Sequence, residues 1–111
     1  MLKNRIPPAG YIVPAPVVLV GTNVKGKPNF NAIGWSVGLE HRPPLVSISS
    51  NQIHHNNVGI RENRTFSINI PSEDMVEITD YCGMKSGRRF DKGSIFAVSY
   101  THLTLPTTPY V

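Results

Sequence analysis

The sequence predicts a mainly β domain with one or two short helices, and three observations lead to that prediction. The chain has 111 residues, which is enough for one domain with one hydrophobic core. Ten prolines and nine glycines break it into short segments, which favours strands and turns over long helices. Residues 65–70 alternate between polar and apolar side chains, as a half-buried strand does.

The predicted elements begin with strands. Residues 6–16 contain four prolines and predict an extended lead-in without a helix. The apolar run that follows, at 17–22, predicts a buried strand. Residues 23–28 have the composition of a turn, and residues 29–37 predict a second strand, so we expect the two strands to form a hairpin.

A second group of elements follows the Arg-Pro-Pro corner at residues 42–44. Residues 45–49 alternate with period two and predict a strand, in which two serines share one side. Residues 53–62 predict a short polar helix. The alternating segment at 65–70 is the most regular strand pattern of the chain.

The best helix signal starts at Ser72, a good N-cap followed by two acidic residues in the first turn. Apolar residues then recur at helical spacing, and Gly83 supplies a stop. The residues on that apolar face are Met75, Ile78 and Cys82. We expect a loop over residues 83–93 and a further strand starting at residues 95–98.

Composition excludes several classes of protein. The single cysteine, Cys82, excludes an internal disulfide framework and favours a reducing, cytoplasmic compartment. The longest apolar run is about six residues, which is too short to cross a membrane. Residues 1–5 carry charge without the apolar segment of a secretory signal.

The formal net charge of +4 permits an anionic partner. The 11 basic residues are spread along the chain, apart from one local cluster of Lys85, Arg88, Arg89 and Lys92. The sequence lacks a basic tail and a basic block interleaved with aromatic residues. Nucleic acid is therefore not the expected partner.

Hydroxyl, imidazole and amide side chains gather where a predicted strand ends and a helix begins. They are Ser47, Ser49, Ser50, His54, His55 and Asn56. Backbone N–H groups at a helix start, with such donors nearby, suit a phosphate group, and the loop cations can add positive charge. A second interpretation of the serines stays open, namely that they have no binding role, because serines on a strand often face solvent. Histidines without acidic or cysteine partners at ligand spacing are commonly surface side chains.

Cys82 and Trp35 each allow two interpretations. Lys85 can activate the Cys82 thiol as a nucleophile, but the place of Cys82 on the apolar helix face favours packing. Trp35 is either a core aromatic residue or a flat wall beside a planar ligand. The sequence shows no Ser/His/Asp or Cys/His triad.

Several stretches together resemble the flavin reductase-like, FMN-binding split-barrel family, and within it the flavoredoxin-type branch. In order they are PAPVVLVGT at 14–22, GKPNFNA at 26–32, PPLVSIS at 43–49, FSINIPS at 66–72, DYCG at 80–83, SGR at 86–88 and DK at 91–92. This resemblance implies a split β-barrel with FMN in a groove, usually at a homodimer interface. It also implies NAD(P)H as the electron donor. The flavin then carries the redox chemistry, and no acid or base residue of the protein is implied.

The resemblance also implies a set of FMN contacts, carried over by position. These are Asn31, Ala32, Trp35 and Ser36 beside the isoalloxazine ring; Ser47, Ser49 and Ser50 along the ring and ribityl chain; His55 and Asn56 at the phosphate; Asn69 on the next strand; and Ser86 and Lys92 in a loop that approaches the cofactor from the partner subunit. Many members of the family have Thr at the position of Asn56. An asparagine can still donate through its amide.

Members of the family are generally longer, so we expect a barrel that is incomplete at its C-terminus. The sequence predicts a flavin reductase-like domain over residues 1–98 and a non-native tail over residues 99–111. That tail has no Asp, Glu, Lys or Arg and resembles translated adapter sequence from assembled metagenomic reads. The predicted function is an FMN-binding oxidoreductase, a flavin reductase or a flavoredoxin-type electron carrier. The alternatives are a small β-barrel binding module for nucleic acid or another anion, and a fragment without function.

Overall fold

A computed structural model describes residues 2–9 and 14–94 of the chain. The predicted strand at 95–98 and the predicted tail at 99–111 lie outside the described residues. Residues 2–9 and 14–17 form neither helix nor strand, as their prolines predict.

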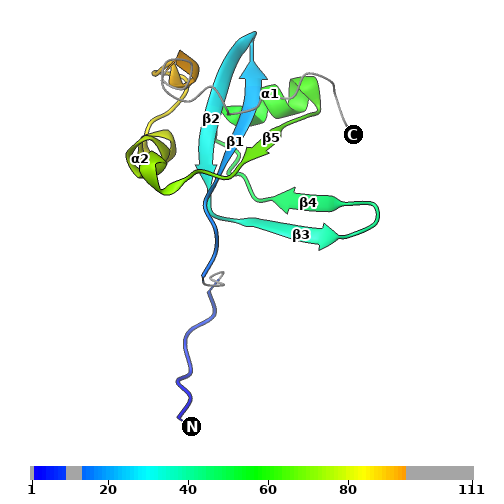
Figure 1. Cartoon of the computed structure of the whole chain (residues 1–111), viewed down its shortest axis with the longest axis vertical. Helices are drawn as coiled ribbons and strands as arrows, with labels where there is room; N and C mark the ends of the chain where they lie inside the picture. The colour runs from blue at the N-terminus through cyan, green and yellow to red at the C-terminus, as the bar shows by residue number, and fades with distance from the viewer. Residues whose placement is uncertain (1, 10–13, 95–111) are drawn as a thin grey trace.

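Three antiparallel strands form the main sheet, in the order β2–β1–β5 (Figure 1). The central strand β1 (Val18–Val24) contains the predicted apolar run. It pairs with β2 (Lys27–Ile33) on one side and with β5 (Ser67–Asn69) on the other. The predicted hairpin and the predicted strand within residues 65–70 are therefore confirmed.

The turn of this hairpin is tighter than the predicted segment 23–28. Only Lys25 and Gly26 lie outside the two strands, with φ angles of 51° and 81°. Two positive φ angles in succession are the mark of a type I′ turn, whose twist matches that of the flanking strands. The ladder of hydrogen bonds can therefore continue to the tip of the hairpin.

The predicted strand at 29–37 is wrong as a single element, because the structure divides it between two sheets. β2 ends at Ile33, and β3 (Ser36–Glu40) pairs with β4 (Leu45–Ile48) in a separate antiparallel hairpin. Gly34 lies at the break, where the missing side chain weakens a strand. Figure 1 shows this second hairpin projecting away from the main sheet.

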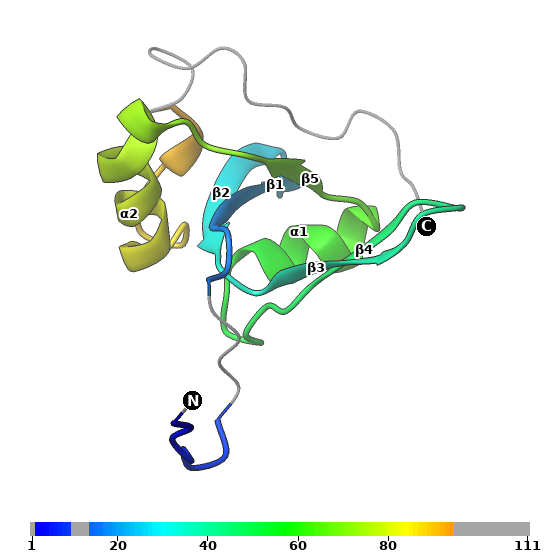
Figure 2. The ribbon, with the colours of Figure 1, turned by 60° about the horizontal axis from the view of Figure 1, so that its bottom comes forward.

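Two helices lie on opposite faces of the main sheet (Figure 2). α1 (Asn56–Asn63) packs against β1 and lies almost entirely within the predicted segment 53–62. α2 (Val76–Met84) packs against β2 and follows a short 3-10 turn, η1 (Glu73–Met75).

Two details of the second helix differ from the prediction. Ser72 makes no capping hydrogen bond to the backbone, and its hydroxyl bonds to the Asp74 carboxylate instead. Gly83 lies inside α2 and does not end it. A Cβ there would lie 3.4 Å from the Cβ of Ala32, which is an ordinary van der Waals contact, so the packing of α2 on β2 does not require a glycine at this position.

The hydrophobic core consists of two clusters, one on each face of the sheet, because successive residues of β1 point to opposite faces. Leu19 and Phe30 pack with Met75 and Cys82 on the side of α2. The second cluster contains Val18, Val20 and Ile33, with half-buried contributions from Ile48, Phe66 and Ile68. The predicted apolar face of the second helix is thus confirmed.

The mostly β character with a few short helices is confirmed. Within residues 2–9 and 14–94 the strands form two separate sheets and no closed barrel. The outer edge of β2 pairs with no other described strand, and the cavities below lie along that edge. Among the helices that the structure describes, none is long and apolar enough to cross a membrane.

Candidate functional site

Two cavities meet at His54. The loop cavity, of about 290 Å³, lies between β2, the start of α1 and the loop that follows α2. The tryptophan cavity, of about 470 Å³, lies where β2 and β4 end, and its lining includes Trp35, Ser49 and Ser50. His54 lines both cavities, which are therefore adjacent, and the two together are called the groove below.

Two polar side chains contact the ring of His54. The side-chain amide nitrogen of Asn31 lies 3.1 Å from Nδ1 of His54, and the hydroxyl of Ser50 lies 3.4 Å from the same atom. An amide nitrogen can only donate, so this contact suits the tautomer in which Nδ1 accepts and Nε2 carries the proton. In that tautomer the middle of the groove has an imidazole N–H.

His55 has a buried polar atom without a partner. Its Nδ1 is buried and makes no hydrogen bond in the part of the chain that the structure describes. Burial lowers the pKa of His55 below its usual value, and the positive charges of Arg88, Lys25 and Lys92 lower it further. A neutral ring among cations, with an unsatisfied nitrogen, is typical of a site for an anion.

The loop after α2 touches β2 and His55 closely at Gly87. A Cβ at this position would lie 2.1 Å from Oδ1 of Asn29 and 2.8 Å from Cδ2 of His55, so a glycine is required. The loop is held by Arg88, whose N–H donates to the Ser86 hydroxyl at 3.2 Å and whose guanidinium donates to the Ile53 carbonyl at 2.5 Å.

Two of the predicted site residues are parts of the frame around the groove. Asn56 is 1% exposed, and its amide donates to the Val20 carbonyl at 2.9 Å while its oxygen accepts from Asn29 at 2.7 Å. Lys92 is 3% exposed and donates to the Cys82 carbonyl at 2.8 Å. Burial lowers the pKa of Lys92, and the charged form has this carbonyl near the end of α2 as a partner.

The structure brings most of the predicted contacts together. The loop cavity is lined by Asn31, His55, Asn56, Ser86 and Lys92. The tryptophan cavity is lined by Ala32, Trp35, Ser49 and Ser50. Three predicted residues line neither cavity: Ser36, Ser47 and Asn69. Ser36 and Ser47 lie on the projecting hairpin, and Asn69 is buried on β5, where its amide donates to the Leu19 carbonyl at 3.3 Å.

One open alternative is decided by the position of the side chain. Trp35 is 57% exposed beside its cavity, which makes it a wall of the groove and not a core residue. His54 and His55 are partly exposed, and both line the loop cavity. His54 belonged to the polar cluster that the sequence suggested for a phosphate group, although the family resemblance implied no FMN contact for it. Gly87 was not assigned to the site, because its contacts depend on tertiary structure.

Cys82 is a packing residue, as its helical position predicts. The residue is fully buried, and burial raises the pKa of its thiol to about 11, an effect that the nearby charge of Lys92 only partly offsets. The thiol therefore stays protonated at neutral pH and is a poor nucleophile.

We expect the Cys82 thiol of the folded protein to react very slowly with iodoacetamide at pH 8, and to react at the rate of an ordinary thiol in urea. The unfolded chain releases this proton near pH 9.0, whereas the folded chain keeps it until about pH 11. Stability is therefore expected to fall as the pH rises through that range. Rapid labelling of the folded protein would contradict the buried position.

These features define a small β-rich domain whose groove has a flat aromatic wall at one end and cations around a buried imidazole at the other. A family model described as the flavin reductase like domain matches residues 10–110. The chain therefore belongs to the flavin reductase-like domain family, as its motifs predict.

Solved structures share this fold. The chain is 43% identical to flavoredoxin from Methanosarcina acetivorans, with a TM-score of 0.81 over 86% of this chain and 52% of that one. It is 29% identical to flavoredoxin of Desulfovibrio vulgaris (Miyazaki F), with a TM-score of 0.81 over 95% of this chain and 60% of that one.

A third solved structure is the FMN-binding protein from Thermus thermophilus with bound 1-cyclohex-2-enone. The identity is 26% and the TM-score 0.73, over 85% of this chain and 53% of that one. A comparison with curated proteins found no match. The chain spans 52% to 60% of the length of these three structures.

Proposed function

We propose that this chain binds FMN in the groove and forms the cofactor-binding part of an oxidoreductase. The parent activity is that of a flavin reductase or a flavoredoxin-type electron carrier that draws electrons from NAD(P)H, in a reducing, cytoplasmic compartment. The observation that carries this proposal is the buried Nδ1 of His55, which has no partner among the described residues and lies in the loop cavity with Arg88 and Lys92, at the opposite end of the groove from Trp35.

The residues present fit this cofactor. FMN has a phosphate dianion at one end and a flat ring system at the other, joined by a chain of hydroxyl groups. His55 and Arg88 suit the phosphate, because an anion beside a neutral imidazole favours its protonation and gives the anion a further charged donor. Trp35 offers a flat apolar face to the ring, and Ser49 and Ser50 offer hydroxyls in the same cavity.

The protein's part in the reaction is to bind and orient. When bound, FMN supplies the hydride and electron chemistry. In the tautomer that accepts from Asn31 at Nδ1, the His54 ring can donate from Nε2 in the groove. Asn56 and Lys92 fix the start of α1 and the end of α2, between which FMN would be held.

We further propose that the parent protein is a homodimer. The hairpin of β3 and β4 exposes apolar side chains that no described part of the chain covers. They are Val37, Leu39, Leu45 and Val46. An apolar surface of this kind marks an interaction site, and a second copy of the protein is the partner that the family resemblance implies. Sedimentation equilibrium tests this, and a monomer at all concentrations would contradict it.

We expect Arg88→Ala to weaken FMN binding about tenfold and riboflavin binding much less, because Arg88 supplies charge to the phosphate end of the groove in addition to its hydrogen bond to the Ile53 carbonyl. Quenching of flavin fluorescence measures both affinities. Arg89→Ala is the matched control, because Arg89 is exposed and lines none of the cavities described here. Equal binding of FMN and riboflavin by the unaltered chain would show that the cations contact no phosphate.

A further inference from the structure

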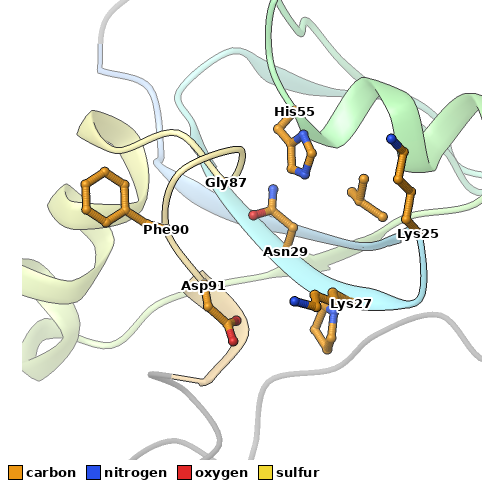
Figure 3. Close-up of a pocket in the computed structure, with 9 residues that line it drawn as sticks. Lys25, Lys27, Asn29, His55, Gly87, Phe90 and Asp91 are labelled. Atoms are coloured by element: carbon orange, nitrogen blue, oxygen red, sulfur yellow. The ribbon is translucent and has the colours of Figure 1, made fainter.

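A second basic hollow lies on the far side of His55 from the loop cavity. This turn pocket, of about 270 Å³, is lined by Lys25 and Lys27 from the β1–β2 hairpin and by Phe90 and Asp91 from the loop after α2 (Figure 3). It shares three lining residues with the loop cavity: Asn29, His55 and Gly87. Those three residues form the wall between the two hollows.

This wall is closed and rigid. The backbone at Gly87 lies so close to Asn29 and His55 that a single methyl group would not fit between them. The Asn29 side chain is 4% exposed and donates to the oxygen of Asn56 at 2.7 Å, which prevents it from swinging aside. A ligand in the turn pocket is therefore separate from a ligand in the loop cavity.

Lys25 lies at the tip of the β1–β2 hairpin and lines the turn pocket. It has a φ of 51° and occupies the first central position of the type I′ turn, where Asn, Asp or Gly is preferred. The positive charge of Lys25 helps to lower the pKa of His55.

The charges of the pocket favour an anion. Lys25 and Lys27 both line it, and Arg88 adds to the positive field at His55. The acidic residue of the lining, Asp91, accepts the N–H of Ser94 at 3.3 Å. In Figure 3 its carboxylate points away from Lys25 and His55.

We propose that the turn pocket binds the phosphoryl group of a second anionic ligand, with Lys25 and Lys27 as its charged partners and His55 as the wall shared with the loop cavity. The chemical class is a pyrophosphate or a phosphate ester of a nucleotide. This proposal goes beyond the FMN site and does not require FMN to be bound there.

Calorimetric titration of the full chain with inorganic pyrophosphate, and separately with ADP, tests the proposal in the presence and absence of FMN. The key variant is Lys25→Asn, because asparagine suits the left-handed conformation and keeps the turn intact. We expect it to weaken pyrophosphate binding about tenfold, through loss of one charged donor, and to leave FMN affinity unchanged. Lys3→Asn, far along the exposed N-terminal segment, is the control.

The outcomes separate this proposal from the FMN assignment. Pyrophosphate binding that persists in saturating FMN and is lost in Lys25→Asn supports a second site. If FMN does not bind, the loss of pyrophosphate binding in Lys25→Asn still supports the turn pocket. Tighter binding of ADP would identify a nucleotide as the source of the phosphate. Competition between pyrophosphate and FMN, or loss of FMN binding in Lys25→Asn, would overturn the proposal by placing the flavin phosphate in the turn pocket. Absence of pyrophosphate and ADP binding would also overturn it.

Discussion

Replacing Gly59 with valine is expected to lower the free energy of unfolding by about 3 kcal/mol. A Cβ at this position would lie 2.3 Å from the backbone oxygen of Asn23 and 3.0 Å from Cγ2 of Thr22. Backbone atoms of β1 cannot move aside as a flexible side chain can, so α1 would have to separate from the sheet. The start of this helix lines the loop cavity, and its displacement would also disturb the groove.

Urea unfolding followed by circular dichroism measures this change, and Gly38→Val is the matched control. A Cβ at Gly38 meets no atom within 4 Å, and the residue lies in a strand, where valine is favoured. The control is therefore expected to be as stable as the unaltered chain. Equal stability of Gly59→Val would mean that α1 does not pack this closely on β1.

Asn56→Ala is expected to cost about 3 kcal/mol of stability, because it leaves two buried groups without partners. The amide of Asn56 donates to the Val20 carbonyl, and its oxygen accepts from Asn29. Neither group can form a replacement hydrogen bond with water, because Asn56 and Asn29 are both almost fully buried. The substitution therefore weakens the attachment of α1 to β1 and β2 beside the loop cavity.

The neighbouring Asn57→Ala variant controls for the loss of an amide at the start of α1. Its side chain donates to the Asn51 carbonyl at an exposed position, so we expect a cost of roughly 1 kcal/mol or less. The experiment also tests the proposed phosphate role of Asn56. If Asn56→Ala unfolds like the unaltered chain but binds FMN more weakly, the amide contacts the phosphate and is not a structural link.

The regular elements were predictable where local pattern and tertiary context agree. β1 begins with a continuous apolar run, and it is buried between a helix on each face of the sheet, as that pattern predicts. The apolar face formed by Met75 of η1 and Cys82 of α2 likewise shows the helical period directly. The division of residues 29–37 into two strands was not predictable, because the apolar pattern continues across Gly34 while the pairing partner changes.

The candidate site was predictable in part, through motifs. Positions such as His55, Ser50 and Trp35 were carried over from the family resemblance, and the structure places all three in the groove. The proposed division of the chain at residue 98 and the individual FMN contacts remain predictions. The roles of Gly87 and Lys25 depend on contacts between segments far apart in the sequence. A local sequence pattern cannot predict such contacts.

The sequence by itself determined the β-rich class, the hairpin at the start of the fold, the helix with its buried cysteine, and the family. Each of these depends on periodicity, turn chemistry or motif order, which are local properties of the chain. Tertiary structure alone decided that Asn56 and Lys92 are buried in the frame and that a buried His55 nitrogen near cations has no partner within residues 2–9 and 14–94. The physical reason is that burial, hydrogen-bond partners and electrostatic fields depend on which distant segments pack together.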